Sequence, residues 1–290
     1  MYLNGKKIFA AINNKRTLPI VSGGGEQPIT KVYITLTQET GKEFSVRGDH
    51  WQYGIDWGDG TISYDTGSHT YENYGDYVIQ IKGKIEAAVE WSEFGGGLKY
   101  GGIVTRSNAS TQGRAVKKVE FDDYALGTCA LAYCTGLEEV VLKGTETELP
   151  DFAFYNSGIS YIPMNNKIRS IGSYAFAYCS NLRSFTIGEN VKEVKSNAFY
   201  LSGDQEYKMT ITIEPVANED RDLSGAAIFQ GAWIETVYLP SRISRIGSNF
   251  LVDNHGTVDV YYEGSEEDFA EIDKANNWAS LSVVIHYLGE

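Results

Sequence analysis

The sequence has few cysteines, prolines and methionines, and it lacks any long apolar run. Its 290 residues include three Cys, six Pro and three Met. Three unevenly spaced thiols do not make a disulfide framework, and they form no zinc-binding pattern with the four His. No apolar stretch reaches the ~18–20 residues that a membrane-spanning helix requires. We therefore expect buried free thiols, no metal, no cofactor and no insertion into a membrane.

Basic residues are also scarce relative to acidic ones. Lys and Arg number 25 against 38 Asp and Glu, a formal net charge of −13. Binding to nucleic acid or to anionic lipid requires a basic face, so neither partner is expected. Residues 1–10 contain lysines but no continuous apolar segment after them, so a cleavable signal peptide is not expected. A protein of this kind stays inside the cell, or leaves it by lysis or by assembly into a particle.

The abundant residues favour short strands and tight turns. Gly occurs 31 times and Tyr 20 times, and 42% of the residues are hydrophobic, enough to bury a core. Residues 1–29 are predicted to be a small N-terminal segment. Asn4-Gly5 marks a hairpin, and a Gly-rich hinge follows from Ser22 to Pro28. The segment is either an ordinary frayed terminus or an anchor, in which residues 1–22 complete their core on a sister subunit or on a virion shell or tail protein.

Residues 30–84 are predicted to be β throughout. Trp57-Gly58-Asp59-Gly60-Thr61, then His69-Thr70-Tyr71, then Gly75-Asp76-Tyr77-Val78-Ile79-Gln80-Ile81-Lys82-Gly83 resemble the PKD family of immunoglobulin-like β-sandwiches. That resemblance implies a spacer or presenting domain without chemistry of its own. Asp59 and His69 could form an acid–base pair, but we expect them to close a turn and a strand end. Residues 85–118 are interpreted as a connecting region of loops and short strands.

The second half repeats, and residues 119–290 are predicted to be a solenoid. Six apolar residue pairs recur in it, and the second residues of successive pairs are 23, 22, 23, 30 and 22 positions apart. They are Ala130-Leu131, Ala153-Phe154, Ala175-Phe176, Ala198-Phe199, Ile228-Phe229 and Phe250-Leu251. One repeat cannot bury its own apolar face, so the copies must stack, with Phe154, Phe176, Phe199 and Phe229 in one buried column. Cys134, Ser157 and Cys179 occupy one repeat position and should also form a column.

The best copy, residues 168–187, has the pattern I-G-x-x-A-F-x-x-C-x-x-L-x-x-F-x-I. This pattern resembles the BspA-like (treponemal-type) leucine-rich repeats of bacterial and bacteriophage surface proteins. The end of the chain, residues 258–287, looks like a closing strand–helix–strand unit. The sequence therefore predicts a mainly β fold, in which a PKD-like β-sandwich is followed by a capped leucine-rich-repeat solenoid (α+β).

The outward positions of the solenoid sheet are the candidate binding residues. They mix polar side chains with Tyr, which offers both apolar area and a hydroxyl group to a ligand. The alternative is an ordinary solvated sheet, where Thr and Tyr are favoured anyway. The candidates are Glu139, Tyr161, Ser184, Thr186, Thr210, Thr212, Thr236, Tyr238 and Tyr261.

No motif for catalysis emerges, so the chain is expected not to be an enzyme. Adjacent carboxylates such as Glu138-Glu139 point to opposite faces of a strand, unlike the facing pair of a glycosidase. The favoured hypothesis is a non-enzymatic bacteriophage virion component, such as a fibre, decoration or receptor-binding protein, present in many copies or as a homo-oligomer. The alternative is a bacterial cell-surface adhesin that binds host glycans or proteins. A carbohydrate-active enzyme is a third reading.

Overall fold

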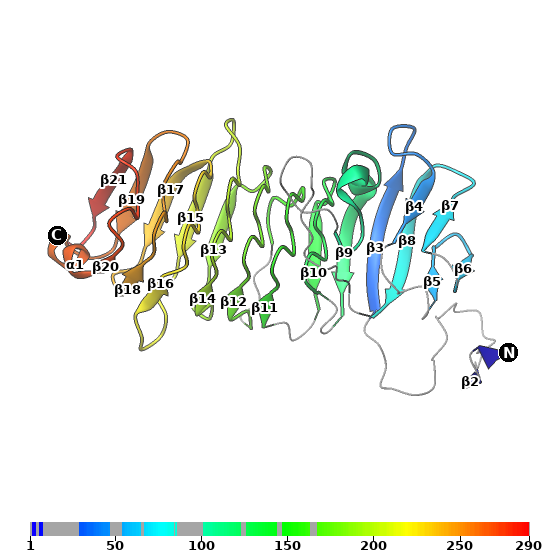
Figure 1. The fold of residues 1–290 in the computed structure, drawn as a ribbon, viewed down its shortest axis with the longest axis horizontal. Coiled ribbons are helices and arrows are strands. Elements are labelled where there is room, and N and C mark those ends of the chain that lie inside the picture. The colour runs from blue at the N-terminus through cyan, green and yellow to red at the C-terminus, as the bar shows by residue number, and fades with distance from the viewer. Residues whose placement is uncertain are drawn as a thin grey trace.

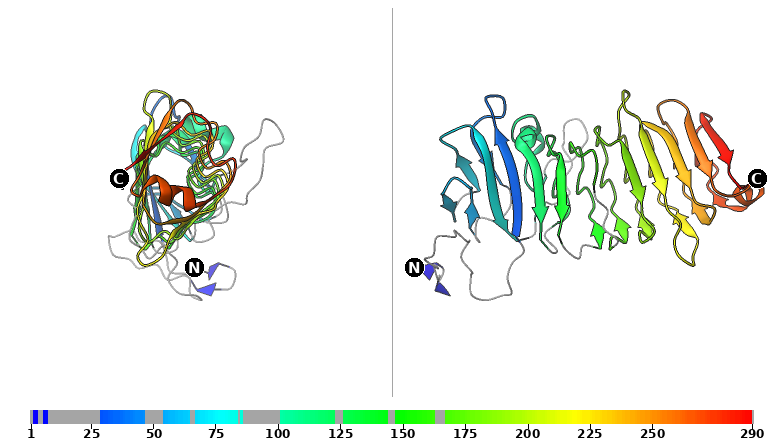
Figure 2. Two further views of the ribbon diagram at one scale, coloured as in Figure 1. Left: turned by 90° about the vertical axis from the view of Figure 1, so that its left-hand side faces the viewer. Right: turned by 180° about the vertical axis from the view of Figure 1, so that it is seen from behind.

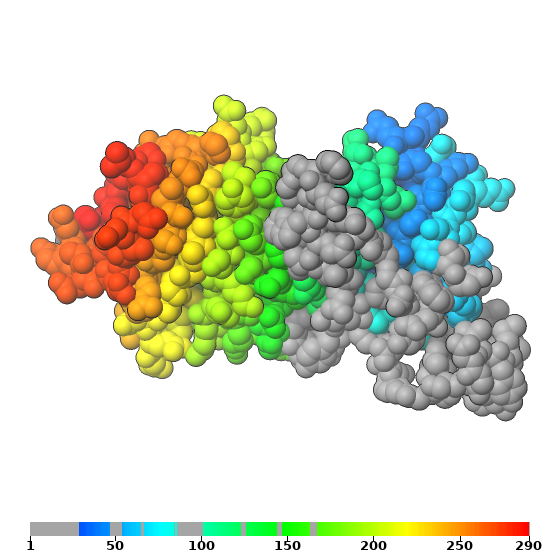
Figure 3. All heavy atoms as spheres, viewed as in Figure 1, coloured from blue at the N-terminus to red at the C-terminus, as the bar shows by residue number. Residues whose placement is uncertain are grey.

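The chain forms an elongated stack of β structure (Figure 1). The N-terminal unit lies at one end of the long axis, and from residue 116 onward the segments follow one another in the order of the sequence to the C-terminus at the other end (Figure 3). The computed structural model describes residues 2–3, 6–7, 29–46, 54–64, 67–83, 85, 101–122, 126–143, 147–162 and 167–289.

The N-terminal unit is built on an antiparallel sheet. Strand β3 (Ile29–Leu36) pairs along its whole length with β8 (Gly75–Lys82), and β8 pairs with β5 (Ile55–Asp56), which pairs with β6 (Ile62–Ser63). Every second side chain of β3 is buried, as its alternating sequence predicts. A separate two-stranded sheet pairs β4 (Glu43–Ser45) with β7 (Ser68–Thr70).

Three large aromatic side chains fill the core of this unit. Phe44, Trp57 and Tyr71 are 1% exposed or less. The Tyr71 hydroxyl donates a hydrogen bond of 2.9 Å to the carbonyl of Trp57, so the one polar atom of the ring is satisfied inside the core. This hydrogen bond ties the Trp57–Thr61 turn to the residue that follows β7.

The sheet continues from the N-terminal unit into the solenoid. Strand β9 (Val116–Phe121) pairs antiparallel with β3 and parallel with β10 (Glu139–Leu142). The sheet order is β10-β9-β3-β8-β5-β6. A 3-10 turn at Arg106–Asn108 and a π-helical turn at Ala109–Gly113 precede β9. Part of the predicted connecting region therefore belongs to the strand that joins the two units.

Charged side chains bridge the strands at this junction. Lys143 lies 2.7 Å from Glu120 Oε2, and Lys118 lies 3.3 Å from Glu120 Oε1 and 2.9 Å from Glu139. The Lys143 hydrogen bond is the largest influence on Glu120. It outweighs the effect of partial burial and, with Tyr33 and Lys118, lowers the pKa of Glu120 to about 2.

We expect Glu120→Gln to make the chain less sensitive to acid. A carboxyl with a lowered folded-state pKa stabilises the fold above its unfolded pKa, and this contribution is lost as pH falls through the folded value. The stability difference between wild type and the variant should therefore shrink between about pH 4.5 and about pH 2. Urea denaturation at a series of pH values measures it, and Lys143→Met should reproduce the effect. Identical acid dependence in all three proteins would contradict the role of Glu120.

From Ser184 onward, successive coils of the solenoid each contribute a short strand to a five-stranded parallel sheet. Its order is β13 (Ser184–Ile187), β15 (Met209–Ile213), β17 (Ile234–Leu239), β19 (Val258–Tyr262) and β21 (Val283–Tyr287). Shorter strands form two further parallel sheets. They are β11 (Glu148–Leu149), β12 (Ser170–Ile171) and β14 (Glu193–Val194), then β16 (Arg221–Leu223), β18 (Ile243–Ile246) and β20 (Asp273–Lys274).

The predicted phenylalanine column is confirmed. Phe154, Phe176, Phe199 and Phe229 are fully buried. Successive ring centroids lie 5.1, 5.2 and 5.1 Å apart, with interplanar angles of 3°, 9° and 25°. Phe250 ends the column with an edge-on contact at 5.2 Å. One ring from each coil thus packs on the ring of the next.

The turns on the side opposite the strands use a backbone conformation that the repeat pattern does not reveal. Residues four apart in each coil have positive φ, among them the bulky Phe152, Tyr174 and Tyr178, at 57°, 54° and 62°. This left-handed conformation costs such residues on the order of 1–3 kcal/mol each. This conformation directs backbone N–H groups toward the next coil. The N–H of Phe152 donates to the carbonyl of Ser173 at 2.9 Å, and the N–H of Tyr178 donates to the carbonyl of Tyr200 at 2.9 Å.

Small and polar side chains pack beside the phenylalanines, and the predicted neighbours Ser157 and Cys179 are in contact. The Cys179 thiol donates to the carbonyl of Phe154 at 3.0 Å, and Ser157 Oγ lies 3.6 Å from Cys179 Sγ. In later coils Ser202 Oγ and Asn254 Nδ2 bind the carbonyls of Phe199 and Phe229. These side chains therefore satisfy carbonyl groups inside the stack.

The three cysteines are free and buried, so a reducing agent should leave the melting temperature unchanged. Burial raises the pKa of the Cys129 thiol to about 12 and that of Cys179 to about 11, and it also raises the pKa of Cys134. Since the thiolate is the reactive form, a thiol reagent should label the folded protein slowly and the urea-unfolded protein at all three sites. Rapid labelling of the native protein would contradict this packing.

A helix closes the C-terminal end. Helix α1 (Glu266–Glu271) begins with a capping box, in which Ser265 and Asp268 each accept a backbone hydrogen bond from the other. Its Phe269 packs against Tyr262 and Trp278. Viewed along the stack, the coils superimpose and α1 lies across their end (Figure 2). The predicted cap is therefore present.

Two predictions concern the remaining parts of the chain. Strands β1 (Tyr2–Leu3) and β2 (Lys6–Lys7) pair antiparallel, which confirms the expected hairpin. Most of the anchor segment, residues 1–22, and the Gly-rich hinge lie outside the described residues. Within the described part of the chain, no helix is long and apolar enough to span a membrane.

Candidate functional site

The exposed face of the five-stranded sheet brings seven of the nine candidate residues together. Strand register aligns Ser184, Thr210 and Thr236 in one row, and Thr186, Thr212, Tyr238 and Tyr261 in a second. Ser184, Thr186 and Tyr238 are exposed, and the others are half-buried. Inward side chains such as Phe185 and Ile211 are buried. Because the strands are parallel and in register, like positions become neighbours on one flat surface.

Glu139 and Tyr161 do not lie on a strand of that sheet. Glu139 is on β10, which belongs to the sheet of the N-terminal unit, and its carboxylate binds Lys118. Tyr161 is 62% exposed and lies in residues 159–162, which have no strand assigned. The coil that carries Tyr161 therefore interrupts the face between β10 and β13.

The second row ends in a stack of three aromatic rings. Tyr238 and Tyr261 lie 5.3 Å apart at 22°, and Tyr261 and His286 lie 4.6 Å apart at 16°. Asp259, on the neighbouring strand β19, forms a hydrogen bond of 2.8 Å between its Oδ1 and His286 Nε2. His286 is not among the candidates from the sequence, which end at the strand of Tyr261. Extending the repeat register one strand further would have placed it beside Tyr261.

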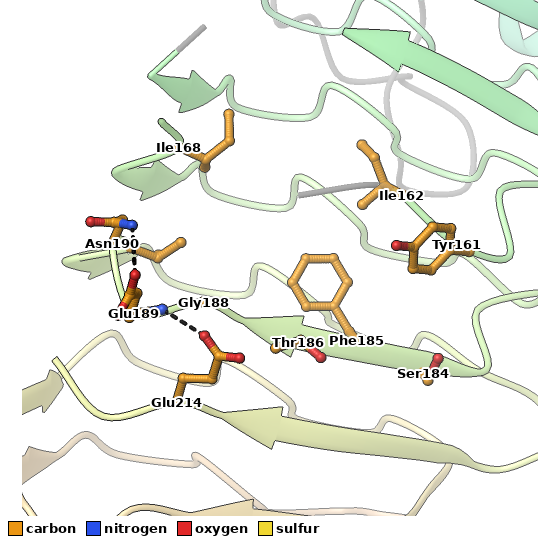
Figure 4. Close-up of a pocket in the computed structure, with 11 residues that line it drawn as sticks. Tyr161, Ile162, Ile168, Ser184, Phe185, Thr186, Gly188, Glu189, Asn190 and Glu214 are labelled. Carbon is orange, nitrogen blue, oxygen red and sulfur yellow. Dashed lines mark hydrogen bonds between the residues drawn. The ribbon is translucent and has the colours of Figure 1, made fainter. Parts of the chain in front are cut away.

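A hollow of about 220 Å³ opens where the coil with Tyr161 interrupts the face (Figure 4). Its apolar side chains include Ile162 and Phe185, and its polar ones include Ser184, Thr186 and Glu214. Three candidate residues, Tyr161, Ser184 and Thr186, thus line a concave site. Sequence reasoning did not identify the two glutamates of its lining, Glu189 and Glu214, because they lie in the turn after β13 and just beyond β15.

Asp59 and His69 are in contact, and Asp59 closes its turn while His69 lies near the end of a strand, as expected. Asp59 Oδ2 lies 2.7 Å from His69 Nε2, and Asp59 Oδ1 accepts hydrogen bonds from the backbone and hydroxyl of Thr61. Partial burial alone would raise the pKa of Asp59, but hydrogen bonds from Thr61 and His69 outweigh it and keep that pKa below its ordinary value.

This cluster does not have the geometry of a nucleophilic triad. A triad uses one ring nitrogen of His for the acid and the other for the nucleophile. Here the same nitrogen, His69 Nε2, faces both Asp59 at 2.7 Å and Thr61 Oγ1 at 3.5 Å. The His69 ring stacks on Trp57 at 5.1 Å. The arrangement fastens a turn to a strand. Within the described residues, no group of three or more His, Cys, Asp or Glu could hold a metal ion.

Comparison with known proteins identifies the repeats. Residues 112–219 match the family model of the BspA type leucine rich repeat region, in six copies. No curated protein matches the sequence. The PKD resemblance of residues 30–84 stays a prediction, because the match begins after them.

Two solved structures are similar to the chain. A leucine rich cell surface protein from Faecalibacterium prausnitzii A2-165 is 16% identical, with a TM-score of 0.24 over 56% of this chain and 64% of the other. A leucine-rich repeat protein from Bacteroides ovatus ATCC 8483 is 14% identical, with a TM-score of 0.30 over 77% of this chain and 69% of the other. The chain thus spans less than two thirds of the first protein. Residues 112–219, which include stacked coils, are thus similar to a BspA type leucine rich repeat region.

Proposed function

We propose that the chain is a non-enzymatic attachment protein, and that the exposed face of β13–β21 binds a macromolecule. The observation that carries the proposal is the in-register surface of hydroxyl groups that ends in the stack of Tyr238, Tyr261 and His286. Tyrosine supplies a large contact area with little loss of conformational freedom, and stacking holds these rings in place before a partner arrives.

The proposed place of action is the outside of a particle or a cell. The favoured location from the sequence is a bacteriophage virion surface, and the alternative is a bacterial cell surface. A host glycan or protein would occupy the sheet face. Residues 1–22 would join a virion shell or tail protein, or a sister copy in a multi-copy assembly.

Immunogold electron microscopy tests this function directly. Antibodies against residues 101–289 should label the outer surface of phage particles or of the bacterial envelope, and the two patterns separate the two locations. Preimmune serum is the control for background. Label confined to the cell interior, in cultures that also contain released particles, would contradict an attachment role.

A further inference from the structure

The hollow beside Tyr161 lies on the proposed binding face and has its own chemistry. Tyr161 borders it from the interrupting coil, Ser184 and Thr186 from β13, and Glu214 from the residue after β15. In Figure 4 the Tyr161 hydroxyl points toward the space above Phe185, and the Glu214 carboxylate reaches across from the opposite side. The floor contains the buried side chains of Ile162, Phe185 and Val191.

The rim of the hollow is fixed before any ligand binds. The backbone N–H of Glu189 donates to Glu214 Oε2 at 2.9 Å, so one carboxylate oxygen holds the rim and the other faces the hollow. Behind the rim, the buried Arg221 donates to the carbonyls of Gly188, Val191 and Glu214. A preorganised site loses less conformational entropy when it binds.

The charge of the lining selects the class of ligand. Glu189 and Glu214 are its charged side chains, and its described residues include no Lys, Arg or His. Carboxylates repel an anionic ligand, and a purely apolar ligand would offer no hydrogen bond to the Glu214 oxygen that faces the hollow. A neutral ligand rich in hydroxyl groups can donate to the carboxylates while an apolar face packs on the exposed ring of Tyr161.

We propose that this hollow binds a neutral saccharide unit. Tyr161 is the stacking platform, Glu214 accepts hydrogen bonds from sugar hydroxyls, and Ser184 and Thr186 bind the edge of the ring. The proposal rests on the proposed function, because it specifies the ligand class for one part of the same sheet face.

An immobilised panel of neutral and sialylated glycans is the first probe, and spermine, titrated by calorimetry, is a cationic probe. Neutral glycans should bind in preference to sialylated ones. Tyr161→Ala and Glu214→Gln should each weaken that binding by about tenfold or more, as expected for a central contact. Tyr207→Ala is the matched control, because Tyr207 is 52% exposed and lies outside the hollow.

Three outcomes would overturn the saccharide site: no binding to any neutral glycan, binding that Tyr161→Ala and Glu214→Gln leave unchanged, or binding of spermine alone. Melting curves of both variants show whether the fold is retained. Glu214→Gln keeps the backbone carbonyl that Arg221 binds. If glycan binding fails while attachment still depends on Tyr238 and Tyr261, only the saccharide site is wrong. If attachment also fails, the proposed function itself is wrong.

Discussion

Replacing Phe176 with Ala should lower the free energy of unfolding by about 3–5 kcal/mol. Phe176 is fully buried and is in the middle of the column, with Phe154 and Phe199 stacked on its two faces and Phe185 against it at 4.9 Å. Backbone hydrogen bonds between neighbouring coils fix the spacing of those coils. The space left by the ring therefore cannot collapse fully, and a cavity remains. Urea denaturation followed by circular dichroism measures the change.

Tyr161→Ala is the matched control for this loss. It also removes an aromatic ring, but that ring is 62% exposed, so the change should stay within about 0.5 kcal/mol. Equal stability losses in the two variants would show that ring stacking inside the coils does not stabilise the solenoid.

Arg221→Met should cost on the order of 3 kcal/mol of unfolding free energy, because the backbone carbonyls of Gly188, Val191 and Glu214 lose a buried donor. The side chain is 1% exposed and reaches from β16 to the turns after β13 and β15. Burial disfavours the charged form and lowers the pKa of Arg221, while Glu214 and Glu219 oppose this effect. Hydrogen exchange should accelerate at residues 188–191, since those backbone groups lose their support.

Arg242→Met removes an arginine with a very different environment. Arg242 binds Asp220 at 2.9 Å, but both side chains are about half exposed, and a surface ion pair contributes at most about 1 kcal/mol. The contrast between Arg221→Met and Arg242→Met therefore isolates the buried carbonyl contacts. A cost for Arg221→Met no larger than that for Arg242→Met would refute the bracing role.

The repeat pattern predicted the inside of the solenoid well. A spacing of 22 or 23 residues can bring Phe154, Phe176 and Phe199 together only if each coil closes at the same length, and the rings do stack. The same register placed Ser157 next to Cys179 and aligned Thr186 with Thr212 and Tyr238. Periodic apolar residues determine these neighbours locally, so one sequence suffices to find them.

Other features depend on contacts that no local pattern records. Glu219-Asp220-Arg221-Asp222 reads as a solvated charged turn, yet Arg221 is buried because two turns bring three carbonyl groups to it. The pairing of β9 with β3 joins segments that are far apart in the chain. The hollow opens beside residues 159–162, which form no strand although the spacing of their coil matches the others. Such features arise from tertiary packing and backbone conformation.

The claim that the sheet face binds a surface ligand is tested most directly by attachment of labelled protein. The wild-type chain should bind saturably to at least one member of a panel of intact bacterial cells and mucin-coated surfaces. The double variant Tyr238→Ser and Tyr261→Ser should bind about tenfold or more weakly, because aromatic rings contribute most of the binding energy in such contacts. Tyr74→Ser, which removes a tyrosine that is 48% exposed in the N-terminal unit, should bind like wild type. Equal binding by wild type and the double variant, or no binding by wild type to any member of the panel, would contradict the account.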